Sequence, residues 1–227
     1  MPKHPSSGPE TVIADAGADN PVDRYAPDWS KPYLKLARFD RPIGSWLLMW
    51  PCMWSLALVA SEVSIYRWPT APAPGWPDPL LIALFFVGAF VMRGAGCTLN
   101  DIADRNYDGK VERTALRPIP SGQVTVLQAS VWMGLLSLVG LAVLLTFNAF
   151  AIVTGAASLV IVAVYPFMKR FTYWPQFVLG LTFNWGALLG WAVVRGDIQL
   201  PAVVLYIAGI FWTLGYDTIY ALQDKED

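Results

Sequence analysis

Oxygen-bearing side chains follow one another at helical spacing in a segment near the middle of the chain. Asn100, Asp104 and Asp108 occupy positions i, i+4 and i+8, which places them along one side of a helix, and Asp101 lies beside them. Such oxygens suit Mg²⁺, which usually keeps several waters and shares its coordination shell with substrate phosphates. The pattern therefore predicts a site for magnesium and a diphosphate. An ordinary solvated acidic helix end, which would show the same residues, is the alternative.

A second acidic segment lies at the end of the sequence. Asp217, Tyr220 and Asp224 are spaced i, i+3 and i+7, again on one helical face. Asp217 precedes Ile219, so we expect it at a membrane boundary, where a lone carboxylate is costly. If the two segments face each other, they form a two-sided cage for magnesium and diphosphate. An acidic chain end without this role is the alternative.

Arg93 is a charged residue inside an apolar run. It precedes Asn100 by two helical turns and so lies on the same helical face. An ionisable side chain within a membrane costs about 2.5–3.5 kcal/mol on insertion scales and usually has a function. Gly94 and Gly96 leave room beside it for close helix packing or for a ligand. We expect Arg93 to bind an anionic substrate group, with a structural ion pair to the first acidic segment as the alternative.

Basic residues between the two acidic segments could bind phosphate oxygens, arginine through its fork of donors and lysine as a point charge. They are Lys110, Arg113, Arg117, Lys169 and Arg170. The alternative is that they only set topology, because cytoplasmic loops of membrane proteins are enriched in Lys and Arg.

Six apolar stretches have to position these residues. Hydrophobic residues make up 55% of the 227-residue chain and charged residues only 15%, compared with about 25% in soluble domains. A membrane-spanning helix needs about 20 mostly apolar residues. The stretches that qualify are 43–61, 80–100, 124–147, 148–168, 175–194 and 198–222. The sequence therefore predicts an all-α, polytopic helical membrane protein with six transmembrane helices.

Lysine and arginine are distributed unequally between the two sides of these spans. With the N-terminus in the cytoplasm, eleven fall on the cytoplasmic side and two, Arg67 and Arg195, on the other. The eleven are Lys31, Lys35, Arg38, Arg41, Arg105, Lys110, Arg113, Arg117, Lys169, Arg170 and Lys225. Because cytoplasmic loops carry the excess of positive charge, we expect both termini and both acidic segments on the cytoplasmic side.

Charge and composition argue against several other functions. A formal net charge of −1 offers no basic face for nucleic acid. The only histidine, His4, lies in the polar N-terminal region, which argues against a histidine-ligated zinc or haem site. Cys52 and Cys97 lie in apolar stretches without CxxC spacing, so we expect them to be packing residues.

Residues 1–30 differ from the rest of the chain. They are rich in Pro, Ser, Gly and Asp and show no apolar periodicity, which predicts a disordered polar tail ahead of a transmembrane domain over 31–227. The tail contains no apolar run typical of a signal peptide. Its acidic residues outnumber its basic ones, which argues against a transit peptide. From this we expect a bacterial inner membrane.

Several segments resemble, in the same order along the chain, the UbiA family of intramembrane aromatic prenyltransferases. They are Arg38-Phe-Asp-Arg-Pro-Ile-Gly44, Asn100-Asp-x-x-Asp104-x-x-x-Asp108, the stretch from Arg113 to Gly122, Tyr165-Pro-Phe-Met-Lys-Arg170 and the stretch from Asp217 to Asp224. The resemblance runs from Lys31 to the end of the chain.

This resemblance implies a helical bundle in the lipid bilayer with a cavity capped on the cytoplasmic side. It also implies an Mg²⁺-dependent transfer of a polyprenyl group from polyprenyl diphosphate to 4-hydroxybenzoate, ortho to its hydroxyl, as a step of ubiquinone biosynthesis. The metal ligands would then be Asn100, Asp104, Asp108 and Asp224, with the basic loop residues and Tyr220 in contact with substrate.

The resemblance also implies roles for the other charged residues. Arg93, with Arg38 and Arg41 behind it, would hold the carboxylate of the acceptor. Asp101 or Asp217 could assist removal of the ring proton, and nothing in the sequence decides between them. The family continues past the end of this sequence with another acidic residue and about three more membrane helices, so we expect a truncated form of the family bundle.

Three alternatives stay open from the sequence. The acceptor could be homogentisate, a naphthoate, haem or chlorophyllide, although Arg93 and the Arg38–Gly44 segment favour a small benzoate. The protein could be an ion-coupled transporter, but no internal repeat is evident and the acidic residues lie at the membrane edge. A phosphatidyl-transferring enzyme would also use aspartates with Mg²⁺, but its Asp-Gly-x-x-Ala-Arg pattern is not in the sequence.

Overall fold

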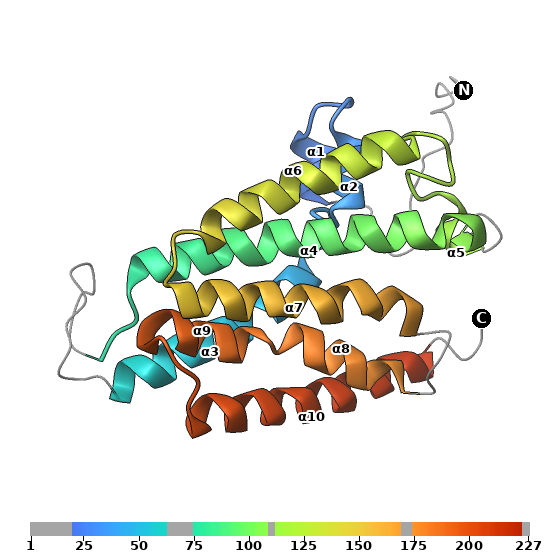
Figure 1. Ribbon diagram of the computed structural model, residues 1–227. Helices are drawn as coiled ribbons and strands as arrows, with labels where there is room; N and C mark the ends of the chain where they lie inside the picture. The colour runs from blue at the N-terminus through green and yellow to red at the C-terminus, as the bar shows by residue number, and fades with distance from the viewer. Residues whose placement is uncertain (1–19, 63–74, 109–111, 169–173, 224–227) are drawn as a thin grey trace, which may run out of the picture.

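The protein is a bundle of α-helices (Figure 1). The computed structural model describes residues 20–62, 75–108, 112–168 and 174–223, and these ranges contain helices and no strands. The long helices are α3 (Ile43–Glu62), α4 (Pro79–Asp108), α6 (Val126–Leu144), α7 (Ala149–Met168) and α10 (Leu200–Gln223). The shorter ones are α1 (Pro21–Tyr25), α2 (Lys31–Leu36), α5 (Glu112–Ala115), α8 (Pro175–Phe183) and α9 (Gly186–Arg195). The predicted all-α fold is confirmed.

Five helical stretches are long and apolar enough to cross a membrane. They are Ile43–Ser61, Pro79–Asp108, Val126–Leu144, Pro175–Arg195 and Leu200–Ala221. The fourth predicted span coincides with the 20-residue helix α7, and within the described side chains its apolar stretch is Ala149–Tyr165. All six predicted stretches are therefore helical, while five of them meet the length of a full span among the described residues.

Helix α4 is the element that carries the first acidic segment. Its 30 residues give a length of about 45 Å, compared with about 30 Å for the hydrocarbon core of a bilayer. The last turns can therefore project beyond the apolar zone while remaining helical to Asp108. The C-terminal ends of α4 and α10 lie at the same end of the bundle, which brings the two acidic segments to one side (Figure 1).

Close helix packing sets the frame around α4. It packs along α6 on one side and α3 on the other, and α3 crosses α9. At that crossing a Cβ on Gly190 would lie 2.9 Å from the Ser55 Cβ, so only glycine permits the contact. The Ser55 hydroxyl donates a hydrogen bond of 2.7 Å to the Ala187 carbonyl, which joins the two helices further.

The fifth predicted span is interrupted, which the hydropathy pattern did not indicate. Helix α8 ends at Phe183 and α9 begins at Gly186. Between them, the buried Asn184 side chain donates to the Gly180 carbonyl at 2.9 Å and to the Thr213 hydroxyl on α10 at 2.8 Å. An asparagine amide that satisfies backbone groups offers an alternative to continuous helix, which explains the break.

Part of the region expected to be a disordered tail is structured. Asn20 caps α1 by accepting a hydrogen bond from the Asp23 backbone N–H at 2.9 Å, and Val22 is buried. Asp23 also forms an ion pair of 2.8 Å with Lys35 in α2. Burial alone would raise the pKa of Asp23, but hydrogen bonds from Lys35 and Asn20 lower it overall. Residues 1–19 lie outside the described ranges.

The hydrogen bond between Asn184, at the break between α8 and α9, and Thr213 of α10 should contribute measurably to stability. Asn184→Ala removes two hydrogen bonds of a buried side chain and should lower the free energy of unfolding by about 1–3 kcal/mol. Combined with Thr213→Val in a double-mutant cycle, it should show a coupling of about 0.6–1.7 kcal/mol in a denaturing-detergent titration. Ser130→Ala, at a half-buried position of α6 where the hydroxyl donates only to the Val126 carbonyl of its own helix, is the matched control. Additive effects of the two substitutions would contradict the proposed cause of the break.

Candidate functional site

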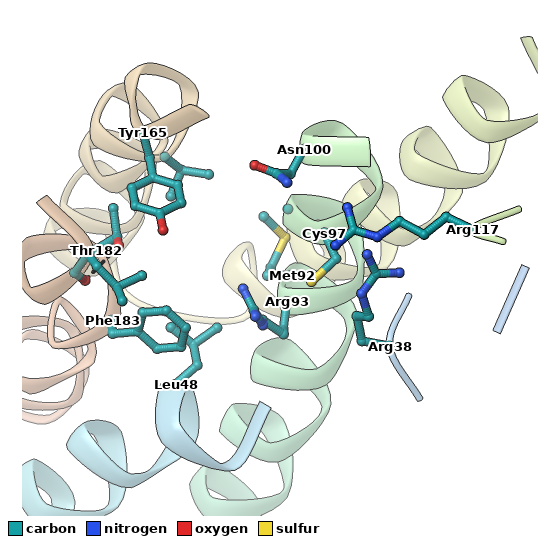
Figure 2. A pocket seen from close by; sticks show the side chains of 13 residues that line it. Arg38, Leu48, Met92, Arg93, Cys97, Asn100, Arg117, Tyr165, Thr182 and Phe183 are labelled. Atoms are coloured by element: carbon teal, nitrogen blue, oxygen red, sulfur yellow. Dashed lines mark hydrogen bonds between the residues drawn. The ribbon is translucent and has the colours of Figure 1, made fainter. Parts of the chain in front are cut away.

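A cavity of about 260 Å³ lies among α3, α4, α7 and α8 (Figure 2). Its lining residues are Arg38, Leu48, Met92, Arg93, Gly96, Cys97, Asn100, Arg117, Val162, Tyr165, Leu179, Thr182 and Phe183. The α4 contribution repeats every three to four residues, as one face of a helix must. Three guanidinium groups reach an otherwise largely apolar wall, so the cavity is suited to an anionic ligand with an apolar body.

Arg93 is held between two uncharged groups. Its Cζ atom lies over the Phe183 ring, 5.1 Å from the centroid, and Figure 2 shows the guanidinium facing that ring. On the α3 side, a Cβ at Gly44 would lie 2.6 Å from the Arg93 Nε and 2.9 Å from Nη2. The Nε atom is buried and has no hydrogen-bond partner among the described residues. The prediction that Arg93 and Asn100 share a cavity-facing side of α4 is confirmed.

Asp101 forms the centre of a buried charge network. It has no exposed surface, and its Oδ1 accepts from Arg38 Nη2 at 2.7 Å and lies 3.3 Å from Arg117 Nη1. The same Arg117 nitrogen donates to Asp108 Oδ2 at 2.9 Å. Asp101 does not line the cavity, whereas both arginines do. Its position therefore suits a counter-ion for two arginines better than a base that reaches a substrate.

Arg38 occupies an unusual backbone conformation at the end of α2. Its φ of 58° is the only positive value at a non-glycine residue in the described part of the chain. The turn is closed by the Phe39 N–H, which donates to the Leu34 carbonyl at 3.0 Å. Glycine usually fills this position, because a left-handed residue with a Cβ costs about 1–2 kcal/mol. The Arg38 side chain, which binds both Asp101 and the Lys35 carbonyl, offsets that cost.

Burial shifts the pKa values of two charged residues that precede α3, Arg38 and Asp40. Burial alone would lower the pKa of Arg38, but the charge of Asp101, its hydrogen bond and the charge of Asp40 together raise the pKa, so Arg38 stays a cation. Burial raises the pKa of Asp40, and Arg41 and Arg38 offset only part of that effect. Arg41 Nε lies 3.7 Å from Asp40, and Arg41 does not line the cavity that contains Arg93.

The acidic segment on α4 divides between two faces. At 3.6 residues per turn, Asp108 lies about 20° from Asp101 around the helix axis and about 80° from Asn100. Asp108 accordingly shares Arg117 with Asp101, while Asn100 faces the cavity. The predicted single stripe of Asn100, Asp104 and Asp108 is therefore wrong for Asp108, because a spacing of eight residues drifts away from the starting face. Whether Asp108 binds metal remains a prediction.

Two further carboxylates, from different helices, are electrostatically coupled to Tyr165. Asp104 of α4 and Asp217 of α10 both interact electrostatically with the Tyr165 hydroxyl. The Oδ1 atom of Asn100 is buried without a hydrogen-bond partner in the described ranges, so it can accept a donor or a cation. Within those ranges, no three Asp, Glu, His or Cys residues gather closely enough to hold a metal alone. Asp224 lies outside them.

Several predicted substrate contacts are not placed in the cavity. Lys110, Lys169 and Arg170 lie outside the described residues, as does the side chain of Arg113 in α5. Tyr220 is described, and 66% of its surface is exposed. Of the predicted basic loop residues, only Arg117 is therefore described at the cavity.

Several residues that line the cavity were not predicted from the sequence. Tyr165 occurred only within a resemblance segment, and Thr182 and Phe183 have no distinguishing sequence pattern. Cys97 was expected to be a packing residue; it is indeed buried, but it also lines the cavity. Its spacing of four residues from Arg93 and three from Asn100 could have placed it on that face.

Comparison with known proteins identifies the family to which this chain belongs. The chain belongs to the UbiA prenyltransferase family, which it matches over residues 48–227. A protein of Aedes aegypti is 50% identical over 226 residues, covering 96% of this chain and 49% of the relative. One of Arabidopsis thaliana is 53% identical over 208 residues, covering 91% and 48%. One of Rattus norvegicus is 50% identical over 226 residues, covering 98% and 57%.

These three relatives are each named mitochondrial 4-hydroxybenzoate polyprenyltransferase. The chain spans about half the length of the curated relatives it matches. Their names contradict the expected location in a bacterial inner membrane, because all three are mitochondrial proteins of eukaryotes. The expectation failed because an acidic tail only argued against a transit peptide and identified no particular membrane.

Two solved structures share the fold. One, described as concerning digeranylgeranylglyceryl phosphate synthase in membranes, has a TM-score of 0.63 at 23% identity and covers 88% of this chain and 65% of that one. The other, a UbiA homologue from Aeropyrum pernix K1, has a TM-score of 0.59 at 24% identity and covers 78% and 63%. At these identities the likeness supports the helical fold alone.

The charge network predicts a large cost for neutralising its centre. Asp101→Asn should lower the free energy of unfolding by roughly 3 kcal/mol, because breaking a buried pair leaves its partners uncompensated. The side chains of Arg38 and Arg117 remain 13% and 17% exposed, which favours the lower end of the usual range. Arg105→Ala, at an exposed position of the same helix, should change stability by less than about 0.5 kcal/mol. Equal effects of the two substitutions would contradict the counter-ion role.

Proposed function

We propose that this protein transfers a polyprenyl group from polyprenyl diphosphate to the ring of 4-hydroxybenzoate. The observation that carries the proposal is Arg93, a guanidinium at the wall of an apolar cavity without a carboxylate partner among the described residues. A benzoate would supply that partner through a bidentate pair. The names of the mosquito, Arabidopsis and rat relatives support the same acceptor.

The size of the cavity favours a single-ring acceptor. A protein cavity of about 150 Å³ is enough to bind benzene, and this cavity measures about 260 Å³. It therefore has room for one substituted ring beside the reactive end of an isoprenoid, whereas haem or chlorophyllide would need a larger space. Leu48, Met92 and Val162 provide apolar surface against which a ring can pack.

The oxygen ligands fit a magnesium ion bound together with a diphosphate. Asn100, through its unpartnered Oδ1, and Asp104 and Asp217, which both interact electrostatically with Tyr165, would hold the ion. Mg²⁺ commonly uses one or two carboxylates and completes its shell with water and substrate phosphates, so a cluster of three carboxylates is not required. When bound, the ion would neutralise negative charge on the diphosphate.

The chain's own residues would then act on both substrates. Arg38 and Arg117, at the cavity wall, stabilise the diphosphate as it leaves the allylic carbon with the bonding electron pair. Arg93 orients the acceptor so that its ring carbon forms the new bond to the allylic carbon, after which the ring loses a proton. The apolar wall excludes water, which would otherwise capture the cation. Asp101 is paired with Arg38 and Arg117 and does not line the cavity, so it is a counter-ion rather than the group that takes this proton.

The function is tested by mass spectrometry of the products formed by the purified protein in lipid vesicles. With 4-hydroxybenzoate, a polyprenyl diphosphate and Mg²⁺, we expect the ring-prenylated acid, and none after chelation of divalent metal. Asp104→Ala should reduce turnover at least about 100-fold while the helical circular dichroism is retained. Arg105→Ala is the matched control on the same helix. Absence of product from the folded wild-type protein would refute the proposal, and metal-dependent ion flux without product would favour the transporter.

Arg93→Lys tests the placement of the acceptor. Lysine keeps the charge but cannot form the planar bidentate pair. Loss of one charge-assisted hydrogen bond is worth about 1.5–3 kcal/mol, so the KM for 4-hydroxybenzoate should rise about 10- to 100-fold. The KM for the polyprenyl diphosphate should stay nearly unchanged. The opposite pattern in steady-state kinetics would show that Arg93 binds the diphosphate.

A further inference from the structure

Two residues without a charge or a hydrogen-bonding side chain hold the Arg93 guanidinium. We infer that Phe183 and Gly44 are positioning residues that fix its orientation and thereby determine selectivity for a carboxylate-bearing acceptor. The inference rests on the proposed function, since it concerns how that acceptor is recognised. It concerns three helices, because Gly44 belongs to α3, Arg93 to α4 and Phe183 to α8.

The three cavity arginines are neutralised in different ways. Arg38 is paired with Asp101, and Arg117 with Asp101 and Asp108, so two carboxylates compensate the two arginines within the protein. Arg93 has no ion pair among the described residues, and its guanidinium carbon lies over the Phe183 ring instead. A ring face attracts a cation without adding a negative charge. Phe183 and Gly44, which together we call the clamp, therefore hold Arg93 in place and leave its charge available to an incoming anion.

The clamp also leaves the right donors free. Contact with a ring face does not consume the N–H groups, so they remain available for a bidentate pair with a carboxylate. Gly44 lies against Nε, where a Cβ would approach to 2.6 Å, and the buried Nε has no partner in the described ranges. A side chain at position 44 would push the guanidinium away from this position. A free arginine side chain would also lose about 2 kcal/mol of conformational entropy on binding, and the clamp reduces that loss in advance.

The break in the fifth span places the ring. Phe183 is the last residue of α8, and the buried Asn184 that follows is bonded to Thr213 of α10. This hydrogen bond fastens the end of α8 to α10 directly beside Phe183, a residue that is 8% exposed and whose ring lies against Arg93.

The test compares Phe183→Leu with Phe183→Tyr, which keeps the ring. We expect Phe183→Leu to raise the KM for 4-hydroxybenzoate by about 2- to 30-fold, as loss of a cation–π contact implies, with the KM for polyprenyl diphosphate unchanged. Phe183→Tyr should stay within about twofold of wild type. In an Arg93→Met background, Phe183→Leu should have no further effect on acceptor binding. A rise shared by both substrates, or an equal loss in Phe183→Tyr, would overturn the inference.

Calorimetric binding separates this inference from the proposed function, because it needs no turnover. The dissociation constant of 4-hydroxybenzoate should rise in Phe183→Leu and Gly44→Ala, whereas that of phenol, which lacks the carboxylate, should not. Phe183→Met provides a second apolar replacement in case Phe183→Leu does not fold. A wild-type protein that binds 4-hydroxybenzoate without forming product refutes the function and still tests the clamp. Equal losses for 4-hydroxybenzoate and phenol overturn the clamp.

Discussion

Charge buried within a helical bundle has to be balanced locally, because neither lipid nor apolar side chains can solvate it. Asp101 meets this requirement for two arginines at once. Through it, the turn that follows α2, the end of α4 and the segment after α5 are joined although they come from separate parts of the chain. The cost of the left-handed backbone at Arg38 is accepted because the side chain completes this network. The basic wall of the cavity depends on the same contacts.

Arg93 shows a second way in which a buried positive charge is stabilised in this protein. A carboxylate beside it would neutralise the charge and compete with an anionic ligand. The Phe183 ring stabilises the cation more weakly and adds no charge. Cavity arginines are thus divided into a compensated pair and an uncompensated single residue.

The shape of the cavity follows from irregularities in otherwise regular helices. Gly44 and Gly190 allow close approach where larger residues would separate the helices. Asn184 lies where the fifth span is interrupted, and its side-chain amide donates hydrogen bonds to the Gly180 carbonyl and to Thr213 of α10. Irregular backbone within a membrane is tolerated where neighbouring protein groups satisfy it. In this protein the irregular backbone directly follows Phe183, which lines the cavity, so the interruption of the helix forms part of the site.

Sequence alone determined the helical class, the positions of the six apolar stretches and the cavity-facing side of α4 that carries Arg93 and Asn100. These properties depend on hydropathy and on the 3.6-residue period, both of which are local. Tertiary structure decided which carboxylate meets which arginine, that Asp108 joins Asp101 rather than Asn100, and that Phe183 faces Arg93. An apolar residue among apolar residues carries no pattern that names its partner. Its partner is set by how helices distant in sequence pack together, and periodicity within one helix contains no information about that packing.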